Sequence, residues 1–173
     1  MRSVFFGTPE FAVPSLEAMV AAGIDVALVV TQPDRPVGRH STPVPSPVAK
    51  AASEKGMRVE KPERVRSNAA LFEEIRKTSP DVGVVVAYGK ILPGELLEIP
   101  RLGFVNVHAS LLPKFRGASP VAAAILAGEE ETGVATMRVV EELDAGPVYL
   151  VRRTAIDPDE DAGTLSRRLS EMG

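Results

Sequence analysis

Short apolar runs without polar alternation constrain the fold of this chain most strongly. Residues 26–30 are wholly apolar, residues 82–86 are interrupted only by a glycine, and residues 2–6 and 104–108 are also rich in Val and Phe. A strand with one wet face alternates apolar and polar residues, whereas a strand covered on both faces stays apolar throughout. The runs therefore predict a parallel sheet buried between two layers of helices.

Segments with helical spacing of apolar residues separate these runs. Residues 11–20 follow the first strand, and Ser46, Ser67 and Ser119 each precede a further helical segment as candidate N-caps. Strands that alternate with helices are typical of open parallel sheets with helices on both faces. We therefore expect an α/β fold, doubly wound and mostly parallel, with a Rossmann-like sheet.

The pattern changes toward the C-terminal end of the sequence. Residues 133–140 and 147–154 read as two strands joined by a turn at residues 144–146, and residues 164–172 have the spacing of an amphipathic helix. Two strands connected so closely pair antiparallel. We expect an antiparallel addition to the sheet near the C-terminus.

Composition excludes several classes of site. The chain has 173 residues, no Cys, and a net charge of −3 from 20 basic and 23 acidic residues. Disulfides, thiolate metal sites and a Cys nucleophile are impossible, and nucleic acid cannot be held mainly by a basic excess. No apolar stretch has the length of a membrane span and the start lacks the features of a signal peptide, so we expect a cytoplasmic protein.

A proline-rich segment follows the second predicted strand. Five prolines lie between Gln32 and Pro47, which is too dense for a helix or a central strand. A long irregular segment inside a compact domain is usually functional or disordered. The residues alone leave open whether this segment is a functional loop or a disordered one.

The first turn does not carry a dinucleotide signature. Residues 7–12 read Gly-Thr-Pro-Glu-Phe-Ala, with one glycine where the dinucleotide fingerprint has three. The missing second glycine prevents close approach of a pyrophosphate to the backbone. A structural strand-to-helix turn is the better interpretation.

Asn106 and His108 are the strongest catalytic candidates. Residues i and i+2 of a strand project to the same face, so the amide and the imidazole would stand side by side at the carboxyl end of a strand. Ligands of open α/β sheets bind at that edge. A histidine there is as often a hydrogen-bonded structural residue, and the residues alone leave both roles open.

Two later segments carry charges with two possible interpretations. Lys114 and Arg116 could be solvated loop charges or could meet an anionic ligand. Asp144 precedes Ala-Gly, so it could simply form a turn. The residues alone leave these alternatives open as well.

Two groups of motifs run along the chain. The first group is Asn106-Val-His108, Ser110-Leu-Leu-Pro113, Arg116-Gly117, Glu131-Thr-Gly133 and Leu143-Asp-Ala-Gly-Pro147. The second group is Phe6-Gly-Thr-Pro-Glu-Phe-Ala12, Thr31-Gln-Pro-Asp-Arg-Pro36 with Gly38-Arg39, and Val85-Val-Ala-Tyr-Gly89. The first group resembles the core of formyltransferases that use 10-formyltetrahydrofolate, and the second narrows the resemblance to the N-terminal catalytic domain of the methionyl-tRNA formyltransferase family. The resemblance spans the whole chain.

The resemblance implies formyl transfer to the amino group of methionine on initiator tRNA. It assigns catalysis to Asn106, His108 and Asp144, and tRNA contact to Arg35 and Arg39 in the loop of residues 33–45. It implies no metal. The implied folate contacts are Tyr88, Gly89, Ile91, Leu92, Ser110, Leu111, Leu112 and Pro113.

The sequence departs from the family pattern in two ways. After Arg39 it reads His40-Ser-Thr-Pro43 where relatives carry Gly and lysines, so we expect a weaker electrostatic grip on tRNA. The family also has a C-terminal β-barrel domain that nothing here encodes. We therefore expect residues 1–173 to form the catalytic domain alone, with low activity on tRNA.

Three alternative functions stay open. A nucleotide-sugar amine N-formyltransferase shares this core, although the Gln-Pro-Asp-Arg-Pro segment disfavours it. A formyltetrahydrofolate hydrolase would use water as acceptor. A folate-binding module without catalysis is the third, although the presence of Asn106, His108 and Asp144 together argues against it.

Overall fold

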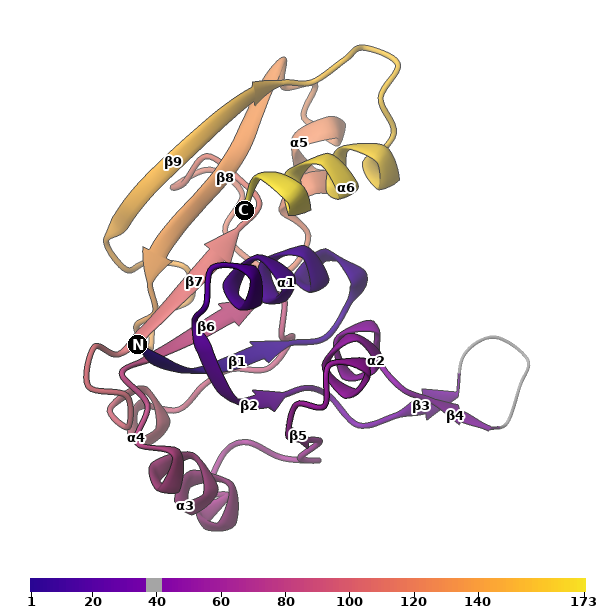
Figure 1. Cartoon of the computed structure of the whole chain (residues 1–173). Coiled ribbons are helices and arrows are strands. Elements are labelled where there is room, and N and C mark those ends of the chain that lie inside the picture. Colours follow the sequence, from indigo (N-terminus) through magenta and orange to yellow (C-terminus); the bar gives the residue numbers. More distant parts are fainter. Residues whose placement is uncertain (37–41) are drawn as a thin grey trace.

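The fold is built on one large sheet in this computed structural model, which describes residues 1–36 and 42–173 (Figure 1). Its strands are β1 (Arg2–Gly7), β2 (Asp25–Val30), β5 (Val59–Glu60), β6 (Val82–Val86), β7 (Phe104–His108), β8 (Glu131–Arg138) and β9 (Val148–Ala155). They lie in the order β5-β2-β1-β6-β7-β8-β9. The strands from β5 to β7 run parallel, and β8 and β9 add antiparallel. The predicted fold class is confirmed.

Helices cover both faces of the sheet. They are the 3-10 turn η1 (Glu10–Ala12), α1 (Val13–Ala21), α2 (Pro47–Glu54), α3 (Ala69–Thr78), α4 (Gly94–Leu97), α5 (Pro120–Leu126) and α6 (Ala162–Met172). Figure 1 shows α1 and α6 on one side and α3 and α4 on the other. No helix within residues 1–36 and 42–173 is both long and apolar enough to cross a membrane.

Alternate residues of β1 supply both cores. Val4 and Phe6 face α3 and α4, whereas Phe5 faces α1 and α6. All three are fully buried. This explains why the strand is apolar without alternation, because neither of its faces meets water.

The proline-rich segment contains a small ribbon. β3 (Arg35–Pro36) pairs antiparallel with β4 (Pro43–Val44), apart from the large sheet. Arg35 is exposed there. Arg39 and His40, to which the sequence drew attention, lie outside the described residues. Pro36 and Pro43 are compatible with this ribbon because, within the described residues, no third strand pairs with it and needs their missing N–H groups.

The predicted helix caps are partly correct. Ser46 caps α2 through its hydroxyl, as predicted. Ser67 as the cap of α3 is wrong: Asn68 Oδ1 accepts the Leu71 N–H at 3.0 Å, so the helix begins one residue later. Ser119 stands at the start of α5 but its side chain makes no capping hydrogen bond. An amide oxygen caps as well as a hydroxyl, so composition alone could not separate Ser67 from Asn68.

The strand order reverses at β1, which lies between β2 and β6. The chain continues from β1 to β2 on one side and from β6 to β7 on the other, so the two connections diverge. Such a point opens a crevice at the carboxyl ends of the strands, where ligands of open α/β sheets bind.

Candidate active site

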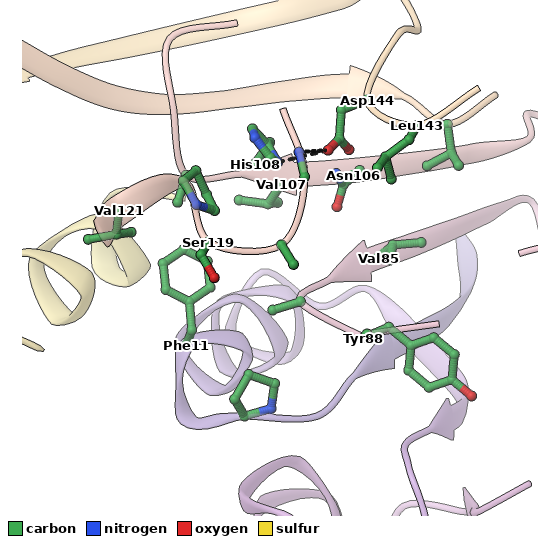
Figure 2. Close-up of a pocket in the computed structure, with 18 of the residues that line it drawn as sticks. Phe11, Val85, Tyr88, Asn106, Val107, His108, Ser119, Val121, Leu143 and Asp144 are labelled. Atoms are coloured by element: carbon green, nitrogen blue, oxygen red, sulfur yellow. Dashed lines mark hydrogen bonds and ion pairs between the residues drawn. The ribbon is translucent and has the colours of Figure 1, made fainter. Parts of the chain in front are cut away.

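A cavity of about 830 Å³ occupies this crevice (Figure 2). Its walls come from residues 9–11 after β1, 87–92 after β6, 106–109 at the end of β7 and 117–122 leading into α5, together with residues between Met137 and Asp144. The volume lies within the range of about 300–1,000 Å³ that is typical of small-molecule sites.

Asn106 and His108, both on β7, line the cavity. They share a face of the strand with Phe104, which belongs to the core under α3 and α4. Val107 belongs to the opposite core, against α6. The end of β7 thus carries an amide and an imidazole at the edge of an otherwise apolar layer.

Asp144 reaches the same place from the connection between β8 and β9. Its Oδ2 lies 3.7 Å from His108 Nδ1, and the two side chains are 11% and 7% exposed. The same oxygen accepts the Gly117 N–H at 2.8 Å. On the far side of the ring, His108 Nε2 lies 3.0 Å from the Phe115 carbonyl oxygen. One nitrogen of the ring is therefore hydrogen-bonded to a carbonyl, and the other faces a carboxylate.

Side chains from two other segments hold the turn after β6 by hydrogen bonds to its backbone. The Tyr88 carbonyl accepts hydrogen bonds from Thr8 Oγ1 at 3.0 Å and from Gln32 Nε2 at 2.9 Å. Gly89 has φ +80°, and a Cβ there would lie 2.6 Å from Gln32 Nε2. This position therefore requires glycine, which explains the Tyr-Gly pair of the motif.

The Tyr88 side chain lines the cavity and packs edge-on against Phe6, with ring centroids 5.2 Å apart. Its hydroxyl is buried and has no hydrogen-bond partner among the described residues. Burial raises the pKa of the Tyr88 hydroxyl to about 12. The ring therefore acts as an apolar wall.

The segments expected to contact folate divide into two groups. Tyr88, Gly89, Ile91 and Leu92 line the cavity. Ser110, Leu111, Leu112 and Pro113 are not among the lining residues, and Ser110 Oγ instead donates to the Lys114 carbonyl at 2.6 Å. The geometry gives this second segment a structural position, and its contact with folate stays a prediction that the cavity does not support.

The two loop cations lie close to neighbouring carboxylates. Lys114 Nζ is paired with Glu129 at 2.8 Å, and Arg116 lies 4.0 Å from Glu142. Lys114 and Arg116 do not line the cavity, and neither does Arg35.

The cavity has few cations. Among the described residues that line it, Lys90 is the only lysine or arginine, and its Nζ donates to the backbone carbonyls of Pro62 and Glu63. Its acidic residues are Glu10, Glu141 and Asp144. No group of three or more His, Asp or Glu side chains within residues 1–36 and 42–173 could hold a metal ion.

Sequence reasoning missed several lining residues. Phe11, Val121 and Met137 form apolar walls, and Gly117 orients Asp144. Phe11 could have been found, because it opens the helical segment that follows the turn after the first predicted strand, close to the ligand-binding edge. Gly117 acts through its backbone N–H, and a backbone contact cannot be predicted from a pattern of side chains.

Bacterial methionyl-tRNA formyltransferases are similar to this chain in sequence. The enzyme of Thermus thermophilus is 54% identical over 173 residues, which are 100% of this chain and 56% of that protein. That of Halorhodospira halophila is 52% identical over 172 residues, 99% of this chain and 55% of the relative. The chain thus spans a little over half the length of the curated relatives it matches.

Solved structures share the fold. Phosphoribosylglycinamide formyltransferase from Bacillus halodurans has a TM-score of 0.80 at 22% identity and covers 98% of this chain and 87% of its own. A formyltetrahydrofolate deformylase from Pseudomonas syringae has a TM-score of 0.75 at 23% identity, covering 99% of this chain and 57% of its own. The family model described as formyl transferase matches residues 1–173. The resemblance seen in the motifs is confirmed, and the chain belongs to the formyl transferase family.

Proposed function

We propose that this chain transfers a formyl group from 10-formyltetrahydrofolate to the amino group of methionine on initiator tRNA, a cytoplasmic step of translation initiation. One observation carries the proposal: the Asn106 amide, the His108 ring and the Asp144 carboxylate meet at the wall of one largely apolar cavity. The similarity to methionyl-tRNA formyltransferases supports the choice of acceptor.

The reaction explains the residue types. When the amine attacks the formyl carbon, negative charge develops on the formyl oxygen, and fixed donors aimed at that oxygen stabilise the transition state. The Asn106 amide is one such donor. A protonated His108 is the other through Nδ1, because Nε2 faces the Phe115 carbonyl whereas Nδ1 lies 3.7 Å from Asp144, too far for a hydrogen bond. Asn106 lies on the same strand face as His108, so both can address one oxygen.

Protons must move on both sides of the transferred carbon. The attacking ammonium loses a proton, and the folate nitrogen that leaves gains one. Asp144 is placed to hold a proton on His108 Nδ1 or to exchange one through water, because its carboxylate is nearly buried beside the ring.

The folate would occupy the end of the cavity near Tyr88 and Leu143 (Figure 2). This end has apolar walls, and the turn at residues 87–92 offers backbone groups along one side. A pterin is flat and carries donors and acceptors on its edge, so apolar walls with backbone partners fit it.

The acceptor would enter from the opposite end, beside Phe11, Ser119 and Val121. These walls suit an apolar side chain such as that of methionine. Phosphoribosylglycinamide and nucleotide sugars carry phosphates, which form their strongest hydrogen bonds with Arg and Lys side chains. Lys90 is the only lysine or arginine among the described lining residues, and it is directed at backbone carbonyls, so we favour a methionyl acceptor. Arg35 and Arg39 would meet the tRNA outside the cavity.

The proposal is tested by offering one labelled formyl donor to several acceptors. With 10-formyltetrahydrofolate labelled in the formyl carbon, we expect label on Met-tRNA and none on phosphoribosylglycinamide or a nucleotide aminosugar. Preferred labelling of a phosphorylated acceptor would contradict the assignment. Release of free formate as the main product would instead favour a hydrolase.

A further inference from the structure

We propose that residues 110–117 form a backbone clamp that positions the His108–Asp144 pair. The clamp consists of the Phe115 carbonyl, the Gly117 N–H, and the Ser110 hydroxyl that closes the turn before them. Its kinetic consequence rests on the proposed function, whereas its structural consequence does not.

The Phe115 carbonyl sets the histidine tautomer. It lies 3.0 Å from His108 Nε2, and a carbonyl oxygen can only accept. Nε2 must therefore carry a proton. The Asp144 carboxylate also only accepts, but at 3.7 Å from Nδ1 it lies beyond hydrogen-bond distance, so the carbonyl decides the tautomer of the neutral ring. Without the Phe115 carbonyl, the ring would be free to exchange its proton between the two nitrogens.

The Gly117 N–H fixes the orientation of the Asp144 carboxylate. It donates at 2.8 Å to Asp144 Oδ2, the oxygen that faces His108 Nδ1 at 3.7 Å. The connection that carries Asp144 is not part of a strand or helix, so the side chain needs an outside partner to fix its direction. A segment of three residues thus holds both members of the pair.

Ser110 makes the clamp rigid. Its side chain is fully buried, its hydroxyl donates to the Lys114 carbonyl at 2.6 Å, and the Lys114 N–H donates to the Leu111 carbonyl at 3.1 Å. These bonds close a turn directly before Phe115. Ser110 therefore becomes a positioning residue rather than a folate ligand.

Gly117 allows a clean perturbation of the clamp. Its φ is +102°, a conformation that L side chains rarely adopt, and a Cβ there would meet no atom within 4 Å. Gly117→Ala therefore adds strain without a clash. Relief of that strain rotates the peptide whose N–H holds Asp144. Gly23→Ala is the matched control, since Gly23 also has a positive φ, +72°, and open space, but lies after α1.

The structural test is the ¹⁵N spectrum of the imidazoles. The chain has only two histidines, so the resonances of His108 are readily assigned with a His108→Gln variant. We expect neutral His108 to be protonated at Nε2 in the wild type and in Gly23→Ala, and to become a mixture of tautomers in Gly117→Ala and Ser110→Ala. A wild-type ring protonated at Nδ1, or spectra unchanged in both clamp variants, would overturn the proposal.

The kinetic test separates positioning from folate contact. Displacing a positioned group by about 1 Å can cost about 10²-fold in rate, so we expect kcat to fall about tenfold or more in Ser110→Ala and Gly117→Ala, with the Kd for folate unchanged. If Ser110 instead contacted folate, Ser110→Ala would raise the Kd for folate and leave kcat unchanged. If the wild type transferred no formyl group, the proposed function would be wrong. The ¹⁵N spectra would still test whether the clamp positions His108.

Discussion

Tyr88 contributes to the cavity through its ring and its backbone, and its hydroxyl has no role that the structure shows. The ring packs against Phe6, and the carbonyl accepts from Thr8 and Gln32. The hydroxyl is buried without a partner in the described part of the chain. A buried polar group without a hydrogen bond costs about 1–3 kcal/mol.

Tyr88→Phe should therefore leave the free energy of unfolding unchanged or raise it by up to about 1 kcal/mol. Folate affinity should stay within about twofold, because the hydroxyl points away from Asn106 in Figure 2. Chemical unfolding and a folate titration check both expectations. A tenfold loss of affinity would mean that the hydroxyl contacts the ligand.

Part of the site could be predicted from single residues, and part could not. Asn106 and His108 follow from their i, i+2 spacing at the end of a strand. Asp144 needed the resemblance, because an Asp before Ala-Gly is an ordinary turn residue. Phe115 and Gly117 act through backbone atoms, which every residue possesses, so their contacts could not be foreseen.

Helix α6 is fastened to the end of β9 by one arginine. Arg168 donates to both carboxylate oxygens of Glu160, at 3.1 Å and 2.6 Å, and also bonds Thr154 and the Ala155 carbonyl. The Glu160 side chain is only 6% exposed. Hydrogen bonds from Arg168 lower the pKa of Glu160 below its usual 4.5.

Glu160→Gln should lower the Tm at pH 7 by about 2–8 °C. Losing a charge-assisted bond costs about 1–2 kcal/mol, and each kcal/mol moves the Tm of a chain of this size by about 2–4 °C. Because the folded pKa lies below the unfolded one, the ion pair stabilises the fold above about pH 4.5 and is lost as the pH falls through the folded value. The gap in Tm should therefore close in acid.

Thermal unfolding between pH 3 and pH 7 measures this gap. Asp159→Asn is the control, since it removes the same charge one position away, outside the ion pair. A gap that is constant with pH, or an equal loss in the control, would mean that the Arg168–Glu160 pair does not hold α6.

Elements with a strong pattern were predictable and short elements were not. The apolar runs predicted the parallel strands, because a strand buried on both faces has apolar residues throughout. β5 has two residues and α4 has four, too few for any periodicity to show. The predicted start of α6 at residue 164 is late, because Asp161 caps the helix through the Thr164 N–H.

At the scale of the whole molecule, charge limits what the chain can bind alone. Its net charge is −3, so few phosphate contacts are available for a long polyanion. The chain spans only 56% of the length of the Thermus thermophilus relative. Linking two binding regions can raise affinity by about 10²-fold or more.

We therefore expect the 173-residue chain to fold by itself and to bind folate as tightly as a full-length relative, with a KM for Met-tRNA raised by about 10²-fold. Folate titration and steady-state formylation, run in parallel on both proteins, check the two halves of this expectation. Equal KM values would show that the present residues suffice for tRNA. Absent folate binding would show that the cavity does not form a working site alone.

The most direct test of the account is the formyl-transfer rate of His108→Ala and Asn106→Ala at saturating donor and Met-tRNA. Loss of one donor to the developing oxyanion costs about 10²-fold or more, so we predict that fall in kcat for each variant, with folate Kd and Tm close to wild type. Turnover near the wild-type rate in one variant would contradict the role assigned to that side chain. Turnover near the wild-type rate in both variants would contradict the location of the active site.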